Sequence, residues 1–264
     1  MQTQKSVFSR LGISESALRR STPAQEGAGL DEDIVQQILL NAEPAQVMTG
    51  LVKQLDGFAN YGLAIRLTQL LRDPVALKDV ASRSYRHGNG FYKIVLSASD
   101  LYKLRLHIWF AEADAEENIH DHRWWFASRI LHGELISETY EDSLSTSDPQ
   151  FPEYFYRGKQ EARAASAELI GISRLRLTGR SVRRAGEGYF LPPGVLHRIT
   201  GIGHGPMTAT LMCQSNPCRA WNRLLTSKDI TPDVEQRYLT RSELKEVLKR
   251  YLLLAGQACS TFPV

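Results

Sequence analysis

The sequence predicts a mainly β protein, a jelly roll or barrel of short strands with α-helical segments at both ends. Between residues 88 and 217, short apolar stretches alternate with turns rich in glycine, proline, serine and aspartate, which is typical of antiparallel strands. The flanking regions instead place apolar residues at helical spacing. All-β runs of this kind fold as sandwiches, jelly rolls or barrels.

The first third of the chain is expected to be flexible and then helical. Residues 1–30 are rich in serine, glycine and alanine with weak periodicity, so we expect a flexible N-terminus. Residues 31–87 repeat apolar side chains every three to four positions, and Pro44 and Pro74 separate successive segments. We therefore predict two or three short helices that form an extension packed on the barrel.

Strands are predicted through residues 88–217, which we assign to the barrel. The clearest is 102–110, where apolar and polar residues alternate strictly, as on a half-buried strand. Residues 142–168 have loop composition, and we interpret them as an insertion. The basic run 174–184 alternates Arg with Leu, which indicates an exposed strand face rather than a phosphate-binding patch.

The C-terminal segment, residues 218–264, is predicted to return to helix. Thr240 and Glu243 form a capping-box pattern ahead of a stripe of apolar residues. Barrel edges and the helical extensions could support a homodimer, although no feature of the sequence requires one.

Charge and cysteine content narrow the class of protein. The 264 residues carry a net charge of only +3, too mild to indicate a nucleic-acid partner, and no apolar stretch approaches the length of a membrane span. The three cysteines form no CxxC pair and are odd in number, which argues against a disulfide framework. We expect a cytoplasmic protein without nucleic-acid or membrane partners.

Two short motifs carry candidate chemistry. In Ile119-His-Asp-His122, residues two apart on a strand point to the same face, so His120 and His122 would project together as a pair of metal ligands. The alternative is that one imidazole is buried and hydrogen-bonded while the other is exposed. The second motif, Gly186-Glu-Gly-Tyr-Phe-Leu-Pro-Pro-Gly-Val-Leu-His197, contains a Pro-x-Gly turn that would start a strand at His197.

In this order, the two motifs resemble those of the cupin superfamily, which implies a cupin-type jelly-roll barrel. Cupins commonly place a Glu ligand four or five residues after the second His, where this chain has Phe126 and Ala127. The resemblance therefore implies a metal site of His120, His122 and His197 without a carboxylate.

A three-His cupin with this local sequence resembles the cysteine dioxygenase family over roughly residues 85–217. The similar segments are the Gly88-Asn-Gly turn, the HxH segment with the following Ile130-Leu-His-Gly-Glu-Leu-Ile-Ser-Glu-Thr139, and His197-Arg198. This resemblance favours Fe(II) and implies O2 and a small-molecule substrate as partners. Imidazole ligands also suit zinc, nickel and copper.

The surroundings of the metal depart from that family. Its outer Ser-His-Tyr shell is replaced, by position, by Thr210, Met212 and Gln214. Gln214, in place of the Tyr, could hydrogen-bond substrate or metal-bound water. Arg86 could correspond to the Arg that binds the substrate carboxylate, with Arg83 as an alternative.

Strand alternation adds further candidates for the site. Arg105 and His107 share one face of their strand, where Arg105 could clamp a carboxylate and His107 could relay protons. The alternative is that this face meets solvent or a covering helix. Trp124 follows the face of the two HxH histidines and would form an aromatic wall, whereas His87, His132 and His204 are expected at the surface.

The resulting hypothesis is a mononuclear non-haem Fe(II) oxygenase, a dioxygenase-type oxidoreductase, acting on a small amino-acid-like or thiol substrate. Two alternatives remain open at this point. One is a redox-neutral metal cupin that catalyses an isomerisation, elimination or rearrangement, and the other is a non-catalytic ligand-binding cupin.

Overall fold

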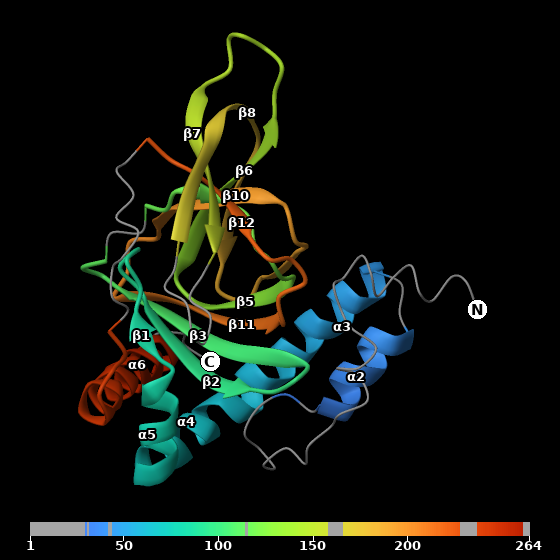
Figure 1. Cartoon of the computed structure of the whole chain (residues 1–264). Helices are drawn as coiled ribbons and strands as arrows, with labels where there is room; N and C mark the ends of the chain where they lie inside the picture. The colour runs from blue at the N-terminus through green and yellow to red at the C-terminus, as the bar shows by residue number, and fades with distance from the viewer. Residues whose placement is uncertain are drawn as a thin grey trace.

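The computed structural model describes residues 30, 32–41, 44–113, 116–157, 166–227 and 237–260. Helices at both ends of the chain cover one side of a pair of antiparallel sheets, as Figure 1 shows. The expected flexible N-terminus falls on residues 1–29, outside the described residues, except that Leu30 is buried and its carbonyl accepts a 2.7 Å hydrogen bond from the Tyr102 hydroxyl.

The helical layer lies where the sequence predicts it, but the described residues before the barrel form four α-helices and a π-helical turn instead of two or three helices. Asp73 caps a helix by accepting backbone hydrogen bonds from Val75 and Ala76, and Pro74 occupies its first position. The predicted capping box is confirmed, because the Thr240 hydroxyl and Glu243 carboxylate each accept the other's backbone N–H. The helices are α2 (Glu32–Asn41), α3 (Pro44–Gly57), the π-helical turn η2 (Phe58–Gly62), α4 (Leu63–Arg72), α5 (Pro74–Ser82) and α6 (Arg241–Ser260).

One sheet packs directly on these helices, and we call it the helix-backed sheet. Its strand order is β1-β2-β3-β11-β5-β9, all antiparallel. The largest hydrophobic cluster joins its outer face to the helices. The strands are β1 (Tyr85–Arg86), β2 (Tyr92–Ala98), β3 (Tyr102–Phe110), β5 (Phe126–His132), β9 (Gly188–Leu191) and β11 (Met207–Ser215).

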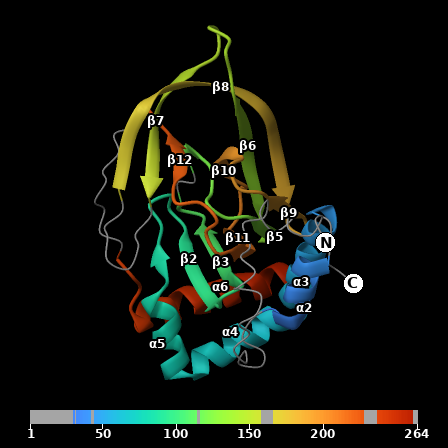
Figure 2. The same cartoon turned by 45° about the vertical axis from the view of Figure 1, so that its right-hand side comes forward.

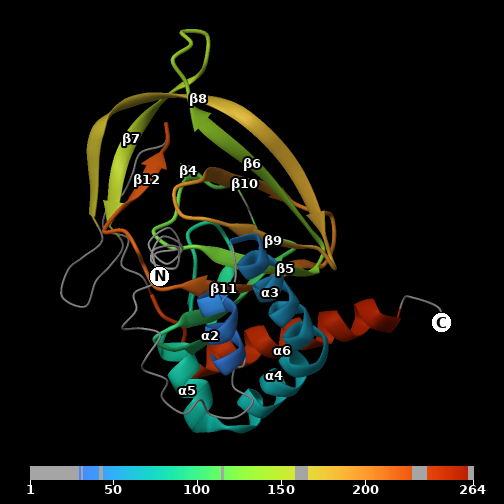
Figure 3. The same ribbon diagram turned by 90° about the vertical axis from the view of Figure 1, so that its right-hand side faces the viewer.

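The second sheet, which we call the arched sheet, closes on itself in the order β10-β4-β12-β7-β8-β6. Its longest strand, β8, pairs with β7 through its first half and with β6 through its second, and Figures 2 and 3 show it bending over the molecule. The strands are β4 (Ile119–His120), β6 (Glu134–Asp142), β7 (Gln150–Arg157), β8 (Ser166–Arg184), β10 (Leu196–Ile202) and β12 (Asn222–Leu225).

The structure differs from the sequence-based boundaries in two places. The barrel begins with β1 at Tyr85 and ends with β12, so it extends beyond 88–217 on both sides. Residues 142–168, expected to be a loop-like insertion, contain β7 and the start of β8. Pro152 makes β7 hard to recognise in the sequence, because proline is disfavoured in central strands. The structure places a register shift directly after it, between Glu153 and Tyr154.

The alternation of β3 decides which side chains enter the space between the sheets. Leu104, Leu106, Ile108 and Phe110 join the cluster under the helices. The intervening Trp109 belongs instead to a small cluster between the sheets. Arg105 and His107 share the face of Trp109 and therefore point inward. None of the described helices has the length and apolar character required to cross a bilayer.

Candidate functional site

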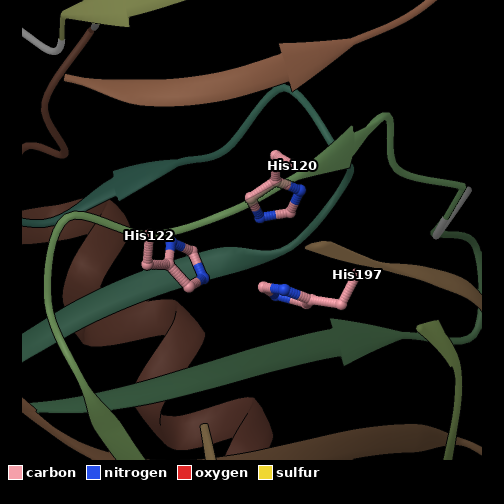
Figure 4. Close-up of side chains that lie close together, drawn as sticks. All are labelled: His120, His122 and His197. Atoms are coloured by element: carbon pink, nitrogen blue, oxygen red, sulfur yellow. The ribbon is translucent and has the colours of Figure 1, made fainter. Parts of the chain in front are cut away.

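The side chains of His120, His122 and His197 converge between the two sheets. His120 ends β4, His122 follows it, and β10 places His197 in direct register with His120. The three ring centroids are 4.6 to 4.9 Å apart, and one potential ligand atom from each ring lies within 4.8 Å of the others. Figure 4 shows the rings turned toward one another.

Backbone carbonyls fix the orientation of two of these rings. The Nδ1 atoms of His120 and His197 lie 2.9 Å from the carbonyl oxygens of Asn118 and Val195. Because a carbonyl only accepts, each Nδ1 carries the hydrogen and donates it. This tautomer leaves Nε2, on the far side of the ring, as the atom that can bind a metal, which is the arrangement of a histidine ligand.

His122 is held by aromatic side chains. Its ring stacks on Trp124 at 5.2 Å with an interplanar angle of 16°, and the edge of Phe126 meets it at 5.2 Å. Phe126 also lies 6.2 Å from the ring of His197. The aromatic wall expected from Trp124 is therefore present beside the histidines.

Burial keeps the imidazoles of His122 and His197 neutral. It lowers the pKa of His122 well below its ordinary value, with a further contribution from the neighbouring His120. It lowers the pKa of His197 to about 3, again with His120 as the next cause. Neutral rings at physiological pH offer nitrogen lone pairs without competition from protons.

Asp121 points away from its two histidine neighbours and anchors the segment that carries them. Its fully buried carboxylate accepts hydrogen bonds of 2.7 Å from the backbone N–H of Arg223 and 2.9 Å from Nη1 of Arg219. The same Nη1 lies 3.1 Å from the position of a Cβ at Gly194, whose φ of +83° forms the turn before His197. Arg219 thus connects the two ligand-bearing segments.

No carboxylate joins the three-histidine cluster among the described residues. The nearby Glu117 uses its two oxygens to accept from the Asn89 side chain and from the backbone N–H of Ile199. Phe126, at one of the positions where many cupins carry a Glu, contributes an aromatic ring instead. The cluster offers three nitrogen ligands and leaves further coordination positions open.

Arg105, His107 and Gln214 all line the inner face of the helix-backed sheet. The register pairs Arg105 with Met212, His107 with Thr210, and Gln214 with Phe126. Nε of Arg105, Nε2 of His107 and Oε1 of Gln214 are buried without a hydrogen-bond partner. The guanidinium carbon of Arg105 lies 5.7 Å from the ring of Trp124, which connects it to His122.

The two arginines proposed from the family resemblance lie elsewhere. Arg86 is exposed and pairs with Tyr92, which packs on the helix side of the sheet. Arg83 donates to the carbonyls of Val95 and Leu96 and pairs with Asp79, so it fixes α5 to β2. Neither side chain joins the histidine cluster: Arg86 faces away from it because alternate residues of a strand face opposite sides, and Arg83 is held at the end of α5.

Two interior residues escape the sequence reasoning. His87, expected at the surface beside a glycine turn, stacks on Phe91 at 4.6 Å, and burial lowers its pKa well below the ordinary value. Lys93 pairs in register with Tyr85 and His107 and so points inward. The alternation of β2 could have identified Lys93, since Ile94 and Leu96 on the other face join the helix cluster.

No protein-family model and no curated protein sequence matches this chain. Solved structures resemble it only in part. Hydroquinone 1,2-dioxygenase from Sphingomonas sp. TTNP3 aligns over 47% of this chain and 65% of its own, with 14% identity and a TM-score of 0.30. Hydroxypropylphosphonic acid epoxidase from S. wedmorenis aligns over 50% of this chain and 54% of its own, with 12% identity and a TM-score of 0.31.

A cupin superfamily protein from Desulfitobacterium hafniense aligns over 52% of this chain and 86% of its own, with 13% identity and a TM-score of 0.27. The chain thus spans less than two thirds of the dioxygenase and the epoxidase. The strand pairing itself carries the assignment of the fold: two facing antiparallel sheets with helices at both ends confirm the mainly β architecture.

Proposed function

We propose that this protein is a mononuclear non-haem Fe(II) oxygenase that acts with O2 on a small amino-acid-like or thiol substrate. The observation that carries the proposal is the convergence of three imidazoles with no carboxylate in the cluster among the described residues. Three nitrogen ligands leave open positions on a divalent ion, which an oxygenase requires for substrate and O2.

The cluster has the dimensions of a metal site. Metal–nitrogen bonds of about 2.1 Å place neighbouring ligand nitrogens about 3.0–3.4 Å apart. The ligand atoms of His120, His122 and His197 lie within 4.8 Å of one another, so movements of about 1 Å by each ring complete the coordination. When bound, Fe(II) would supply a centre at which a substrate heteroatom and O2 can bind side by side.

The surrounding residues would orient the substrate and exclude water. The rings of Trp124 and Phe126 cover the side of His122, which keeps solvent from that part of the site. Arg105 is placed to hold an anionic group of the substrate. The unpartnered Nε2 of the buried His107 could form a hydrogen bond with substrate, and the free Oε1 of Gln214 could accept one.

A redox-neutral reaction at the same metal site is the second candidate. The buried His107, with its unpartnered Nε2, suits the proton transfer that an isomerisation or elimination needs. The positions of Thr210, Met212 and Gln214 also lack the Tyr expected of a thiol dioxygenase. A ligand-binding cupin without turnover is the remaining alternative, and it predicts tight binding with unchanged ligand.

The first test is the metal content of protein purified without added metal and without a metal-binding tag. We expect near-stoichiometric iron in the native chain and its loss in His197→Ala, whereas His204→Ala, which changes an exposed histidine, should keep it. The iron-loaded protein should then consume O2 with a thiol or amino-acid-like substrate. Turnover without O2 uptake would favour the redox-neutral reaction, and failure to bind iron even on anaerobic reconstitution would refute the metal site.

A further inference from the structure

Two cationic side chains lie together on the inner face of the helix-backed sheet. Lys93 of β2 pairs in register with His107, and Arg105 of β3 pairs with Val95, so the two cations are diagonal neighbours on one face. Both act electrostatically on the buried His107 between them and lower its pKa, after the larger effect of burial. Lys93 and Arg105 therefore form one positive centre, which we call the interior cation pair.

No acidic side chain of the described residues forms an ion pair with either cation. Lys93 hydrogen-bonds to Tyr85, and its ammonium lies 5.2 Å from the Tyr85 ring and 5.9 Å from the Phe91 ring. Nε of Arg105 is buried without any acceptor. Glu117 is the acid whose charge acts on Lys93, but both of its oxygens already accept hydrogen bonds from other groups.

Aromatic neighbours offset only part of the cost of this arrangement. The faces of Tyr85, Phe91 and Trp124 attract the cations, but they accept none of the five N–H donors of the Arg105 guanidinium. Two like charges inside a protein repel each other and lose hydration. Burial lowers the pKa of Arg105 only to about 10, so the guanidinium keeps its charge and its unused donors at neutral pH.

The cation pair remains within reach of a ligand. Lys93 and Arg105 both keep accessible surface although they point between the sheets, as do His120 and His122. Trp124 connects the two centres, at 5.7 Å from the Arg105 guanidinium carbon and 5.2 Å from the His122 ring. Because both distances are measured to Trp124, the Arg105 guanidinium carbon lies no more than 10.9 Å from the centroid of the His122 ring.

We propose that Lys93 and Arg105 together bind an oxyanion group of the substrate, a carboxylate or a phosphonate, while the other end of the substrate faces the three histidines. The inference rests on the function proposed above and narrows its substrate class. The substrate is a short molecule with an oxyanion at one end and a metal-binding heteroatom a few carbon atoms away. Arg105 supplies the paired donors that match an oxyanion, and Lys93 supplies a second charge.

Calorimetric titration of the metal-free, full-length chain with acetate and with methylphosphonate tests the proposal. We expect saturable binding of at least one anion, weakened by at least about tenfold in Arg105→Gln and in Lys93→Gln, because each loses a charge-assisted hydrogen bond. Arg105→Lys should retain more affinity than Arg105→Gln. Arg72→Gln removes an exposed arginine of the helical layer and should bind as the native chain does.

The two probes also separate the two sources of the oxyanion, since tighter acetate assigns a carboxylate and tighter methylphosphonate assigns a phosphonate. No saturable binding to the native chain would overturn the proposal. Equal affinities in Arg105→Gln, Lys93→Gln and Arg72→Gln would overturn it as well, provided that thermal unfolding shows each variant folded.

Because these titrations contain no metal, their outcome is independent of the iron measurement. Anion binding in a chain that takes up no iron would support the anion site at Lys93 and Arg105 and would refute the Fe(II) oxygenase. Iron binding in a chain that binds neither anion would refute the anion site at Lys93 and Arg105 but would still be consistent with the oxygenase.

Discussion

At the scale of single residues, the candidate metal centre depends on groups that never contact the ion. The carbonyls of Asn118 and Val195 fix the tautomers of His120 and His197, and Asp121 fixes the segment between the two HxH ligands. A carbonyl orients an imidazole without adding the negative charge that a carboxylate would add. A divalent ion bound by these histidines would therefore keep its full positive charge. That charge would favour the binding of anionic ligands.

We predict that Asp121→Asn weakens iron binding by about ten- to hundredfold, the usual cost of losing an outer partner of a ligand. The amide removes the charge that Arg219 meets, and its NH2 group cannot accept from the Arg223 backbone. Competition with a chelator of known affinity measures the effect. Asp142→Asn is the control, because it removes an exposed partner of Arg223 and leaves the ligand segment intact. Equal iron affinities in the two variants would contradict the role of Asp121.

At the scale of elements, the helices and the helix-backed sheet form a single packed unit. Leu63, Leu67 and Leu70 of α4 are buried at helical spacing and belong to the same cluster as Leu104 and Leu106 of β3. The inner face of that strand carries Arg105 and His107. Packing of the helices against β3 therefore holds in place the strand that carries Arg105 and His107.

We predict that Leu67→Ala lowers the free energy of unfolding by about 2–5 kcal/mol, the cost of a large-to-small change at a fully buried site. Ile65→Ala on the same helix alters a side chain that is 59% exposed and should change stability by less than about 0.5 kcal/mol. Urea unfolding followed by circular dichroism measures both. A separate early transition of the helices in Leu67→Ala would contradict a single packed unit.

At the scale of the whole molecule, an apolar core and a polar interior lie on opposite faces of one sheet. The helix side of that sheet is filled by the largest hydrophobic cluster. The face toward the arched sheet carries Lys93, Arg105 and His107, opposite the three metal-ligand candidates. Stability comes mainly from the first face and chemistry from the second, so substitutions on the two faces should affect different measurements.

The buried histidines predict a dependence of stability on pH. Burial, followed by the charge of Lys93, lowers the folded-state pKa of His87 and of His107 well below the ordinary 6.5. Below that pH the unfolded chain binds protons that the folded chain does not. The free energy of unfolding of the metal-free protein should therefore fall as the pH drops from about 6.5 to 5.5, by about 1 kcal/mol for each such histidine.

Urea titrations at a series of pH values measure this slope, and His107→Gln should reduce it by the share of one histidine. A slope that is the same in the variant and the native chain would show that His107 binds protons equally in the folded and unfolded states, which would contradict its lowered pKa. Stability that rises toward acid would contradict the inferred burial of both histidines.

Local pattern was enough to predict several of these features. The strict alternation of residues 102–110 predicts β3 and places Arg105 with His107 on one face. The spacing of His120 and His122 predicts that they point together, and the Pro-x-Gly turn predicts a strand at His197. Each of these inferences depends on residues within a few positions of one another, where backbone geometry alone sets side-chain direction.

The sequence by itself determined the class of fold and the helical ends, because strand and helix periodicities are local, and its resemblance to the cupin motifs pointed to the three histidines. Tertiary structure alone decided that His87 enters the interior, that Arg86 stays outside, and that β8 arches across to pair with two strands. Those features depend on register between strands distant in the chain. Register follows from the packing of whole faces, which no short pattern encodes.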